Sequence, residues 1–324
     1  MNGLRKSLLV LLAALAPALC FAQASAWPTK PIRMVIAYPP GGSTDVSGRL
    51  LAERLSKSLG QQVIVENRSG AGGTVGASSV VRAEPDGYTI LLAASPEVSI
   101  APVTVKAMPY DPVKDLQPIT LVGQVPFLLV THPSVPANTL AEFIAHARAN
   151  PNKLNYSSFG NNTSNHLFGE LFKVTAQVQA VHVPYKGSGP SITDLIGGQI
   201  QYTFDTPPAT LAHVAAGRLK ALAVTAQERL PGAPNVPTMA EAGFPALVGG
   251  TWFGLLAPAK TPQPIIERLH KETVAALQSP ELRKSFEDRG VRPSPTSPQE
   301  FGRFIQNEVA KWTKLAEKVG IVAE

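Results

Sequence analysis

The sequence has 324 residues, with 29 basic residues against 23 acidic ones, and this length suits two domains of ordinary size. The basic residues are spread singly, without a stripe and without interleaved aromatics, which argues against nucleic-acid binding and against a lipid-binding surface. The six histidines show no metal-ligand spacing and the one cysteine is at position 20, so we expect no metal site, no disulfide and no cofactor.

The N-terminal residues have the layout of a cleaved secretory signal. Arg5 and Lys6 precede an apolar run, Leu8–Phe21, and small residues follow it up to the expected cut before Trp27. A membrane anchor is the alternative, but the run contains Pro17 and is shorter than the roughly 20 residues of a spanning helix. We therefore expect an exported, periplasmic chain. The cut lowers the net charge from +6 to +4, a mild excess that favours anionic small ligands.

Short β-branched and apolar runs alternate with amphipathic stretches along the rest of the chain. This alternation predicts an α/β protein with largely parallel sheets. The expected strands are Ile32–Ala37, Val63–Val65, Tyr88–Ala93, Phe127–Val130, Asn155–Ser158, Val181–Val183, Ile200–Phe204, Leu219–Val224 and Trp252–Leu256.

Capping residues mark three of the expected helices. Thr139 with Glu142, and Ser297 with Glu300, have the spacing of capping boxes, in which two residues satisfy each other's backbone N–H groups. A further helix is expected within residues 279–290, because a proline suits its first turn and a glycine its left-handed exit. The last helix is expected to run nearly to the C-terminus and to dock its apolar face on a sheet.

A glycine-rich turn follows the first expected strand and leads into a helix. Unpaired backbone N–H groups at such a helix start, reinforced by the helix dipole, bind an anion well. No Gly-Lys-Ser/Thr sequence closes the turn, so it is not a nucleotide P-loop. A plain strand-to-helix turn with Ser43 as its N-cap is the alternative. The candidate binding residues here are Tyr38, Gly42, Ser43, Thr44 and Asp45.

A second segment, 157–166, repeats this design after the strand that begins at Asn155. Most of its residues are Ser, Thr or Asn, and small hydroxyls and amides at a helix start give a carboxylate directional donors without burying a lysine or arginine. We expect His166 to be a structural donor in the first helical turn. The candidate binding residues are Ser158, Asn161, Thr163 and Ser164.

Two further polar residues follow later strands. Asp205 ends a strand, and the carboxyl ends of strands are where open α/β sheets place ligands. Lys186 could pair with a ligand carboxylate or with Asp205, although a solvated lysine is the simpler interpretation.

Enzymatic motifs are weak or missing in this sequence. Gly70–Val75 resembles a dinucleotide fingerprint, but Val75 stands where the third glycine belongs. No Gly-x-Ser-x-Gly elbow occurs. The absence of such motifs favours a binding protein over an enzyme.

Taken in order, several linked motifs resemble the receptors of tripartite tricarboxylate transporters, the Bug family of periplasmic binding proteins. The similarity covers essentially the whole chain after the expected cut. The motifs are Trp27–Ile32, Pro39–Asp45, Val65–Gly73, Pro85–Thr89, Tyr110–Asp115, His166–Phe172, Pro184–Gly187 and Glu308–Trp312.

This resemblance implies the type II periplasmic binding protein fold, in which two Rossmann-like α/β lobes are joined by two crossover strands and close like a Venus flytrap. We expect residues 1–26 to be the signal peptide, 27–126 plus 247–324 to form one lobe, and 127–246 to form the other. In such receptors the two loops described above each present a helix start to the proximal carboxylate of the ligand.

The sequence departs from the family pattern near two of these positions. Asn162 stands where a glycine is frequent, and Pro96 and Glu97 follow Ser95 where many relatives carry small or amide residues. Ser95 is a further candidate binding residue. If Glu97 faces the cleft, it would disfavour a second ligand carboxylate and favour a donor such as an amine or hydroxyl.

The resemblance also implies a function and its partners. The chain would be a monomeric receptor that binds a small organic carboxylate and delivers it to the permease subunits of a tripartite tricarboxylate transporter. One alternative is a ligand sensor that docks on a membrane signalling partner. The other is an enzyme acting on a carboxylate, for which Asp45, Glu97 and Asp205 are weakly supported candidates for the acid and the base.

Overall fold

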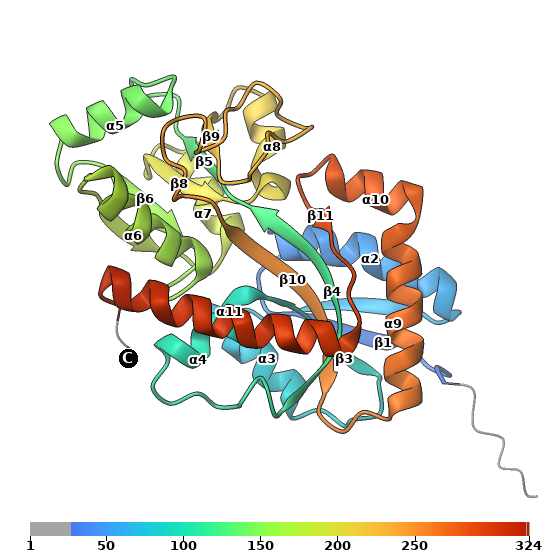
Figure 1. Ribbon diagram of the computed structural model, residues 1–324. Coiled ribbons are helices and arrows are strands. Elements are labelled where there is room, and N and C mark those ends of the chain that lie inside the picture. The colour runs from blue at the N-terminus through green and yellow to red at the C-terminus, as the bar shows by residue number, and fades with distance from the viewer. Residues whose placement is uncertain (1–26, 322, 324) are drawn as a thin grey trace, which may run out of the picture.

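The computed structural model describes residues 27–321 and 323, so the expected signal peptide lies outside the described residues. Two β-sheets form the centres of two α/β lobes (Figure 1). Within the described residues, no helix combines the length and the apolar run that crossing a membrane requires.

Lobe 1 is built on a six-stranded sheet with the order β11-β4-β10-β3-β1-β2. Its strands are β1 (Ile32–Ile36), β2 (Val63–Asn67), β3 (Thr89–Ala94), β4 (Leu116–Pro126), β10 (Gly250–Pro258) and β11 (Arg292–Pro293). β1 pairs in parallel with β2 and β3, whereas β10 runs antiparallel to β3 and β4.

Lobe 2 is built on a five-stranded sheet with the order β7-β6-β8-β5-β9. Its strands are β5 (Leu128–Thr131), β6 (Asn155–Ser158), β7 (Val181–Pro184), β8 (Tyr202–Asp205) and β9 (Lys220–Val224). β6 is parallel to β7 and β8, whereas β5 is antiparallel to β8 and β9. Each sheet is therefore mixed. The strand that the chain enters from the other lobe, β10 in lobe 1 and β5 in lobe 2, runs antiparallel to its parallel neighbours.

Helices cover both faces of each sheet, as expected for an α/β protein. In lobe 1, α2 and α9 pack on one face, and α3 and α11 pack on the other. In lobe 2, α5 and α6 cover one face, and α7 and α8 the other. The helices are α2 (Ser43–Leu59), α3 (Thr74–Val81), α4 (Ala101–Thr104), α5 (Leu140–Ala149), α6 (Ser164–Ala176), α7 (Ser188–Ile196), α8 (Pro207–Ala215), α9 (Gln263–Gln278), α10 (Pro280–Glu287) and α11 (Pro298–Val319), with short turns η1 (Ala71–Gly73) and η2 (Pro96–Ile100).

Two crossing segments join the lobes. The first leads from β4 through Phe127 into β5, and the second enters β10 through Gly249. Thr225 binds both: its hydroxyl accepts from the Phe127 N–H at 2.8 Å and donates to the Gly249 carbonyl at 2.6 Å. The sequence analysis missed β4, because its prolines and glycine at 118, 123 and 126 hide the strand pattern.

The capping predictions are confirmed at one helix and wrong in detail at another. Ser297 and Glu300 form the expected capping box of α11. Thr139 accepts from the Glu142 N–H, but the Glu142 carboxylate accepts from the Asn138 N–H instead of the Thr139 N–H.

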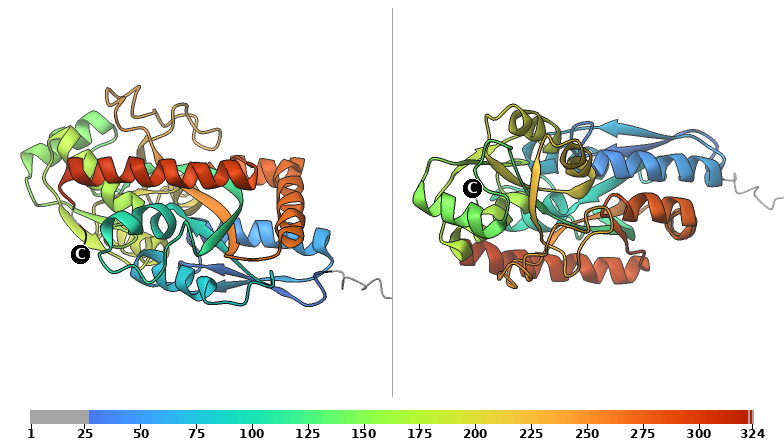
Figure 2. Two further views of the ribbon diagram at one scale, coloured as in Figure 1. Left: turned by 60° about the horizontal axis from the view of Figure 1, so that its bottom comes forward. Right: turned by 90° about the horizontal axis from the view of Figure 1, so that it is seen from above.

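The C-terminal helix α11 covers more than the expected sheet (Figure 2). Its first half packs Phe301 and Ile305 on lobe 1, and further along Trp312 joins a buried cluster with Ile100 and with Leu167 of α6 in lobe 2. α11 is therefore a third structural link between the lobes.

Candidate functional site

A small cavity, partly open to solvent, lies between the two lobes. Lobe 1 contributes the β1–α2 turn and the end of β3, and lobe 2 contributes the turn before α6 and the start of α7. Strand β10 forms the remaining wall. The lining residues are Tyr38, Gly42, Ser43, Thr44, Ala94, Pro96, Phe159, Ser164, Ser188, Thr251 and Phe253.

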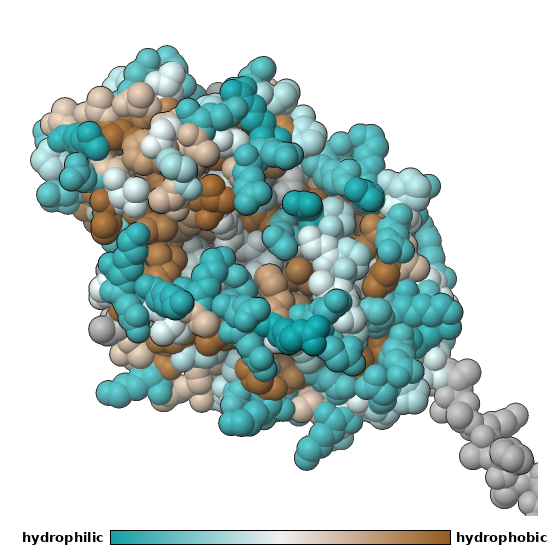
Figure 3. Space-filling model, in the orientation of Figure 1, coloured by the Kyte–Doolittle hydropathy of each residue, from teal (hydrophilic) through white to brown (hydrophobic). Residues whose placement is uncertain are grey.

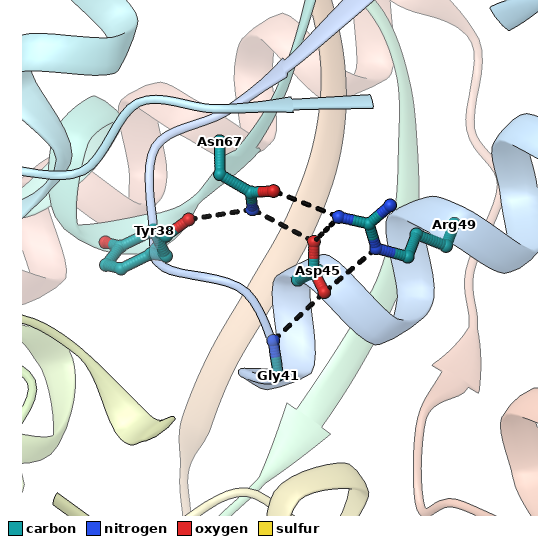
Figure 4. Close-up of polar contacts among 5 residues, drawn as sticks. All are labelled: Tyr38, Gly41, Asp45, Arg49 and Asn67. Carbon is teal, nitrogen blue, oxygen red and sulfur yellow. Dashed lines mark hydrogen bonds and ion pairs between the residues drawn. The ribbon is translucent and has the colours of Figure 1, made fainter. Parts of the chain in front are cut away.

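The turn before α2 is held in place by Asp45 (Figure 4). The Asp45 carboxylate accepts from the Gly41 N–H at 3.0 Å, from Asn67 at 2.9 Å and from Arg49 at 2.9 and 3.1 Å. Asn67 also donates to the Tyr38 carbonyl at 2.9 Å. Burial acts to raise the pKa of Asp45, but the hydrogen bonds from Arg49, Gly41 and Asn67 outweigh it and lower this pKa. The Asp45 side chain thus supports the turn and does not line the cavity.

The start of α2 is left open toward the cavity. Its N-cap is Gly42, in extended conformation, so the alternative in which Ser43 caps the helix is wrong. No side chain caps this helix start. Ser43 and Thr44, in the first turn, are buried and line the cavity. Their backbone N–H groups and the positive end of the helix dipole are therefore available to an anion there.

The start of α6 has the same character on the other side of the cavity. Thr163 is the N-cap, but its hydroxyl donates to the Gly160 carbonyl and to Asn165 Oδ1 and does not cap the helix. Ser164 lines the cavity with 1% of its surface exposed, and its hydroxyl has no hydrogen-bond partner. A buried hydroxyl without a partner is costly, which points to a ligand at this position.

Two other candidates in this segment support the turn. The Ser158 hydroxyl donates to the Gly160 carbonyl at 2.9 Å and lies 2.6 Å from His182 Nε2. Asn161 is exposed, and its backbone carbonyl faces Gly72 of lobe 1. Neither side chain lines the cavity.

Asp205 lies directly behind the cavity wall. It is fully buried, and its carboxylate accepts from the Ser188 hydroxyl at 2.8 Å and from the Thr206 N–H at 2.6 Å. Burial raises the pKa of Asp205 to about 7, against the opposing effect of these hydrogen bonds. Lys186 is exposed, and the ion pairs found within the described residues do not join it to Asp205.

A second buried carboxyl, Glu97, lies behind the wall of lobe 1. It accepts from the Tyr38 hydroxyl at 2.8 Å and from the Ala94 N–H at 2.7 Å. Burial raises the pKa of Glu97 to about 7. Glu97 does not itself face the cleft, which corrects the conditional expectation made from the sequence. Ser95 likewise lies behind the wall, with its hydroxyl 2.8 Å from that of Thr251.

The sequence analysis did not single out several lining residues. Ser188 lies in a third candidate segment, 184–190, which also leads into a helix, but only Lys186 and Asp205 were considered there as binding residues. Phe159 lies within the second segment but carries no polar group. Thr251 and Phe253 are on β10, and only the folded arrangement of the lobes reveals their place in the site.

A larger groove lies on the face where the crossing segments meet, and appears as the hollow in Figure 3. It is lined by charged residues of both signs, including Arg229, Glu308 and Lys311. No uncapped helix start faces it, so the smaller cavity is the better anion site.

The two-lobed architecture with a cavity between the lobes is accompanied by a match to a known family. Residues 48–321 match the sequence pattern described as "Tripartite tricarboxylate transporter family receptor". The chain belongs to this family. A receptor of this family is a solute-binding protein that serves a tripartite tricarboxylate transporter.

Similar proteins agree with this assignment. Protein BugT of Bordetella pertussis is 38% identical over 298 residues, covering 92% of this chain and 91% of BugT. The structure of the periplasmic binding protein BugD has a TM-score of 0.89 at 34% identity, over 92% of this chain and 100% of BugD. A protein of R. palustris solved with adipate has a TM-score of 0.90 at 36% identity, over 92% and 100% of the two chains. These likenesses establish the two-lobed periplasmic binding protein fold.

Proposed function

We propose that this receptor is exported to the periplasm, where its lobes close over one carboxylate group of a small organic acid, and that it delivers this ligand to membrane permease subunits. The observation that carries the proposal is the convergence of two uncapped helix starts, α2 from lobe 1 and α6 from lobe 2, on one cavity. A carboxylate there would accept from both lobes at once.

Binding and closure are coupled in this arrangement, because neither lobe alone completes the site. If four to six hydrogen bonds to the charged group each contribute about 1.5 to 2 kcal/mol, the gross gain is about 6 to 12 kcal/mol. The costs of closure and ordering are subtracted from this gain, so the net affinity is weaker than the sum of the hydrogen bonds, which suits capture followed by release.

The rims of the two lobes already touch in this structure. Asn162 Nδ2 of lobe 2 donates to the Thr104 carbonyl of lobe 1 at 3.4 Å. A Cβ atom on Gly72 of lobe 1 would lie 3.9 Å from Thr163 Cγ2 of lobe 2. These contacts support a closed arrangement of the lobes, in which Thr225 links the two crossing segments.

Binding without chemical conversion fits the positions of the acidic residues. The two buried carboxyls, Glu97 and Asp205, are separated from the cavity by Tyr38 and Ser188, and Asp45 is fully engaged in its own turn. A paired acid and base in contact with the ligand, which an enzyme would need, is not among the lining residues of the described cavity.

The direct test is a thermal-shift screen of the purified chain over mono-, di- and tricarboxylates, because a ligand that binds only the folded state raises the unfolding midpoint. Hits are then measured by isothermal titration and recovered for mass spectrometry. We expect micromolar binding and an unchanged ligand. A consumed ligand would establish an enzyme instead.

Gly42→Val is the matched variant for this test. A Cβ atom at Gly42 would lie 3.8 Å from Ser188 Cβ across the cavity, so the valine methyl groups would fill the anion site. The extended backbone of Gly42 tolerates valine, so the unfolding midpoint should hardly change while the affinity falls at least tenfold. Unchanged affinity would argue against the start of α2 as the site.

A further inference from the structure

The cavity gathers its free hydrogen-bond donors at one place. They lie at the starts of α2 and α6: the first-turn N–H groups and hydroxyls of Ser43 and Thr44, and the unpartnered hydroxyl of Ser164. This set satisfies one carboxylate.

The rest of the lining is mainly apolar. It consists of Ala94, Pro96, Phe159, Phe253 and the Tyr38 ring. No lysine, arginine or histidine side chain is among the residues that line the described cavity. A second ligand carboxylate would therefore lose its hydration there without gaining a cation.

Ser188 and Thr251 also line the cavity, and their hydroxyls are already hydrogen-bonded within the protein. Ser188 gives its hydrogen to Asp205, so the side of its oxygen that faces the cavity offers a lone pair and repels an anion. Thr251 shares a hydrogen bond with Ser95 at 2.8 Å. These groups suit a neutral or donating part of a ligand better than a carboxylate.

Each lobe also places a buried carboxyl directly behind the wall. Glu97 is faced by the hydroxyls of Tyr38 and Tyr110, of which Tyr110 donates to the Glu97 carbonyl. Asp205 is faced by Ser188 and Thr206. Hydroxyls and backbone N–H groups are the partners found for both carboxyls within the described residues, and no ion pair there neutralises either. When ionised, they add negative potential to a poorly hydrated cavity.

We propose that the cavity selects small monocarboxylates with an apolar body, and that Glu97 and Asp205 act from behind its wall to exclude a second carboxylate. This inference rests on the proposed function of the same site and names its substrate class. It separates this receptor from the adipate-bound relative, since adipate has two carboxylates.

The test compares matched pairs of acids by isothermal titration at pH 8. Pentanoate is compared with glutarate, and hexanoate with adipate, so that the members of a pair differ by one carboxylate. We expect the monocarboxylate to bind at least tenfold more tightly in each pair. A dicarboxylate that binds equally well or more tightly overturns the inference and leaves the proposed function intact. If no carboxylate of any class binds, the proposed function itself fails.

Two further measurements assign the selection to the buried carboxyls. Burial raises the pKa of both Glu97 and Asp205 to about 7, so lowering the pH from 8 to 6 should protonate both carboxyls. The ratio of monocarboxylate to dicarboxylate affinity, called the discrimination below, should then fall at least threefold in the wild-type receptor. Asp205→Asn keeps an acceptor for Ser188 and removes one of the two charges, so it should reduce the ratio of monocarboxylate to dicarboxylate affinity at pH 8 by a smaller factor than the pH change does.

The control is Glu53→Gln, which removes an exposed carboxylate paired with Lys57 on α2 and should leave the ratio unchanged. Discrimination that stays the same at both pH values and in Asp205→Asn would overturn the role of the buried carboxyls. Should Asp205→Asn fail to fold, the wild-type comparison between pH 6 and pH 8 decides alone.

Discussion

Gly187 in lobe 2 lies directly against Pro39 in lobe 1: a Cβ atom on Gly187 would come within 2.8 Å of Pro39 Cδ. Gly187 has a φ of +130°, and the next residue, Ser188, lines the cavity. The rims of the lobes therefore meet beside the candidate site, at a point with no room for a side chain.

Gly187→Ala should hinder closure and weaken ligand binding about tenfold, because the new methyl group collides with Pro39. Gly217→Ala is the matched control, since Gly217 also has a positive φ, of +68°, but has nothing within 4 Å of its Cβ position. Both variants should lose unfolding free energy, and Gly187→Ala should lose more, about 1 to 3 kcal/mol, because φ +130° with ψ 180° is a region that only glycine readily adopts. Affinity should fall only in Gly187→Ala. If Gly187→Ala and Gly217→Ala bind the ligand equally tightly in isothermal titration, closure at this contact is contradicted.

Ser164→Ala should lower affinity for a carboxylate about threefold to thirtyfold without loss of stability, because the buried hydroxyl has no hydrogen-bond partner within the protein. Thr273→Val is the control: its hydroxyl is also buried and unpartnered, but it lies in α9 and does not line the cavity. Titration and urea unfolding of both variants check this. A Thr273→Val variant that loses affinity as strongly as Ser164→Ala would refute a direct role for Ser164.

Asp205 should make the folded state less stable as the pH rises from about 4 to 7. Its pKa is raised by burial from 3.8 to about 7, so between these values the folded chain holds a proton that the unfolded chain releases. Asp205→Asn removes this effect. The unfolding free energy of the variant minus that of the wild type should therefore be larger at pH 8 than at pH 5, by about 2 kcal/mol.

Urea unfolding at the two pH values measures this difference. The exposed Asp288, paired with Lys284, provides the control variant Asp288→Asn, which should show a much smaller change. A difference of the opposite sign for Asp205→Asn would mean that Asp205 is stabilised as an anion in the folded protein.

Thr225→Val should destabilise the junction of the lobes by about 1 to 3 kcal/mol, because the Phe127 N–H and the Gly249 carbonyl would each lose a buried partner. Thr225→Ser keeps the hydroxyl and should restore most of the loss. Small-angle scattering without ligand should show a broader range of lobe separations only for valine. If the two variants have the same stability and the same range of lobe separations, the Thr225 hydroxyl does not hold the crossing segments together.

Much of the fold could be predicted from the sequence, because its local patterns agree with the final structure. The buried apolar runs became β1, β3 and β8, and the capping pair Ser297 and Glu300 opens α11 as expected. β4 was missed because it crosses between lobes, and its prolines and glycine are tolerated by pairing with β10 and β11.

The candidate site was predictable only where the signal is local. The glycine-rich and hydroxyl-rich helix starts of α2 and α6 carry that signal in their own residues. Whether a polar side chain there faces a ligand or supports its turn depends on contacts with distant residues, such as Asn67 for Asp45 and His182 for Ser158. Composition alone does not distinguish these cases.

A crystal structure with a bound monocarboxylate tests the central claim most directly. The account predicts the carboxylate within hydrogen-bond distance of the Ser43 or Thr44 backbone N–H in lobe 1 and of the Ser164 hydroxyl in lobe 2. A carboxylate bound instead in the groove beside Arg229 and Lys311, or touching only one lobe, would contradict it.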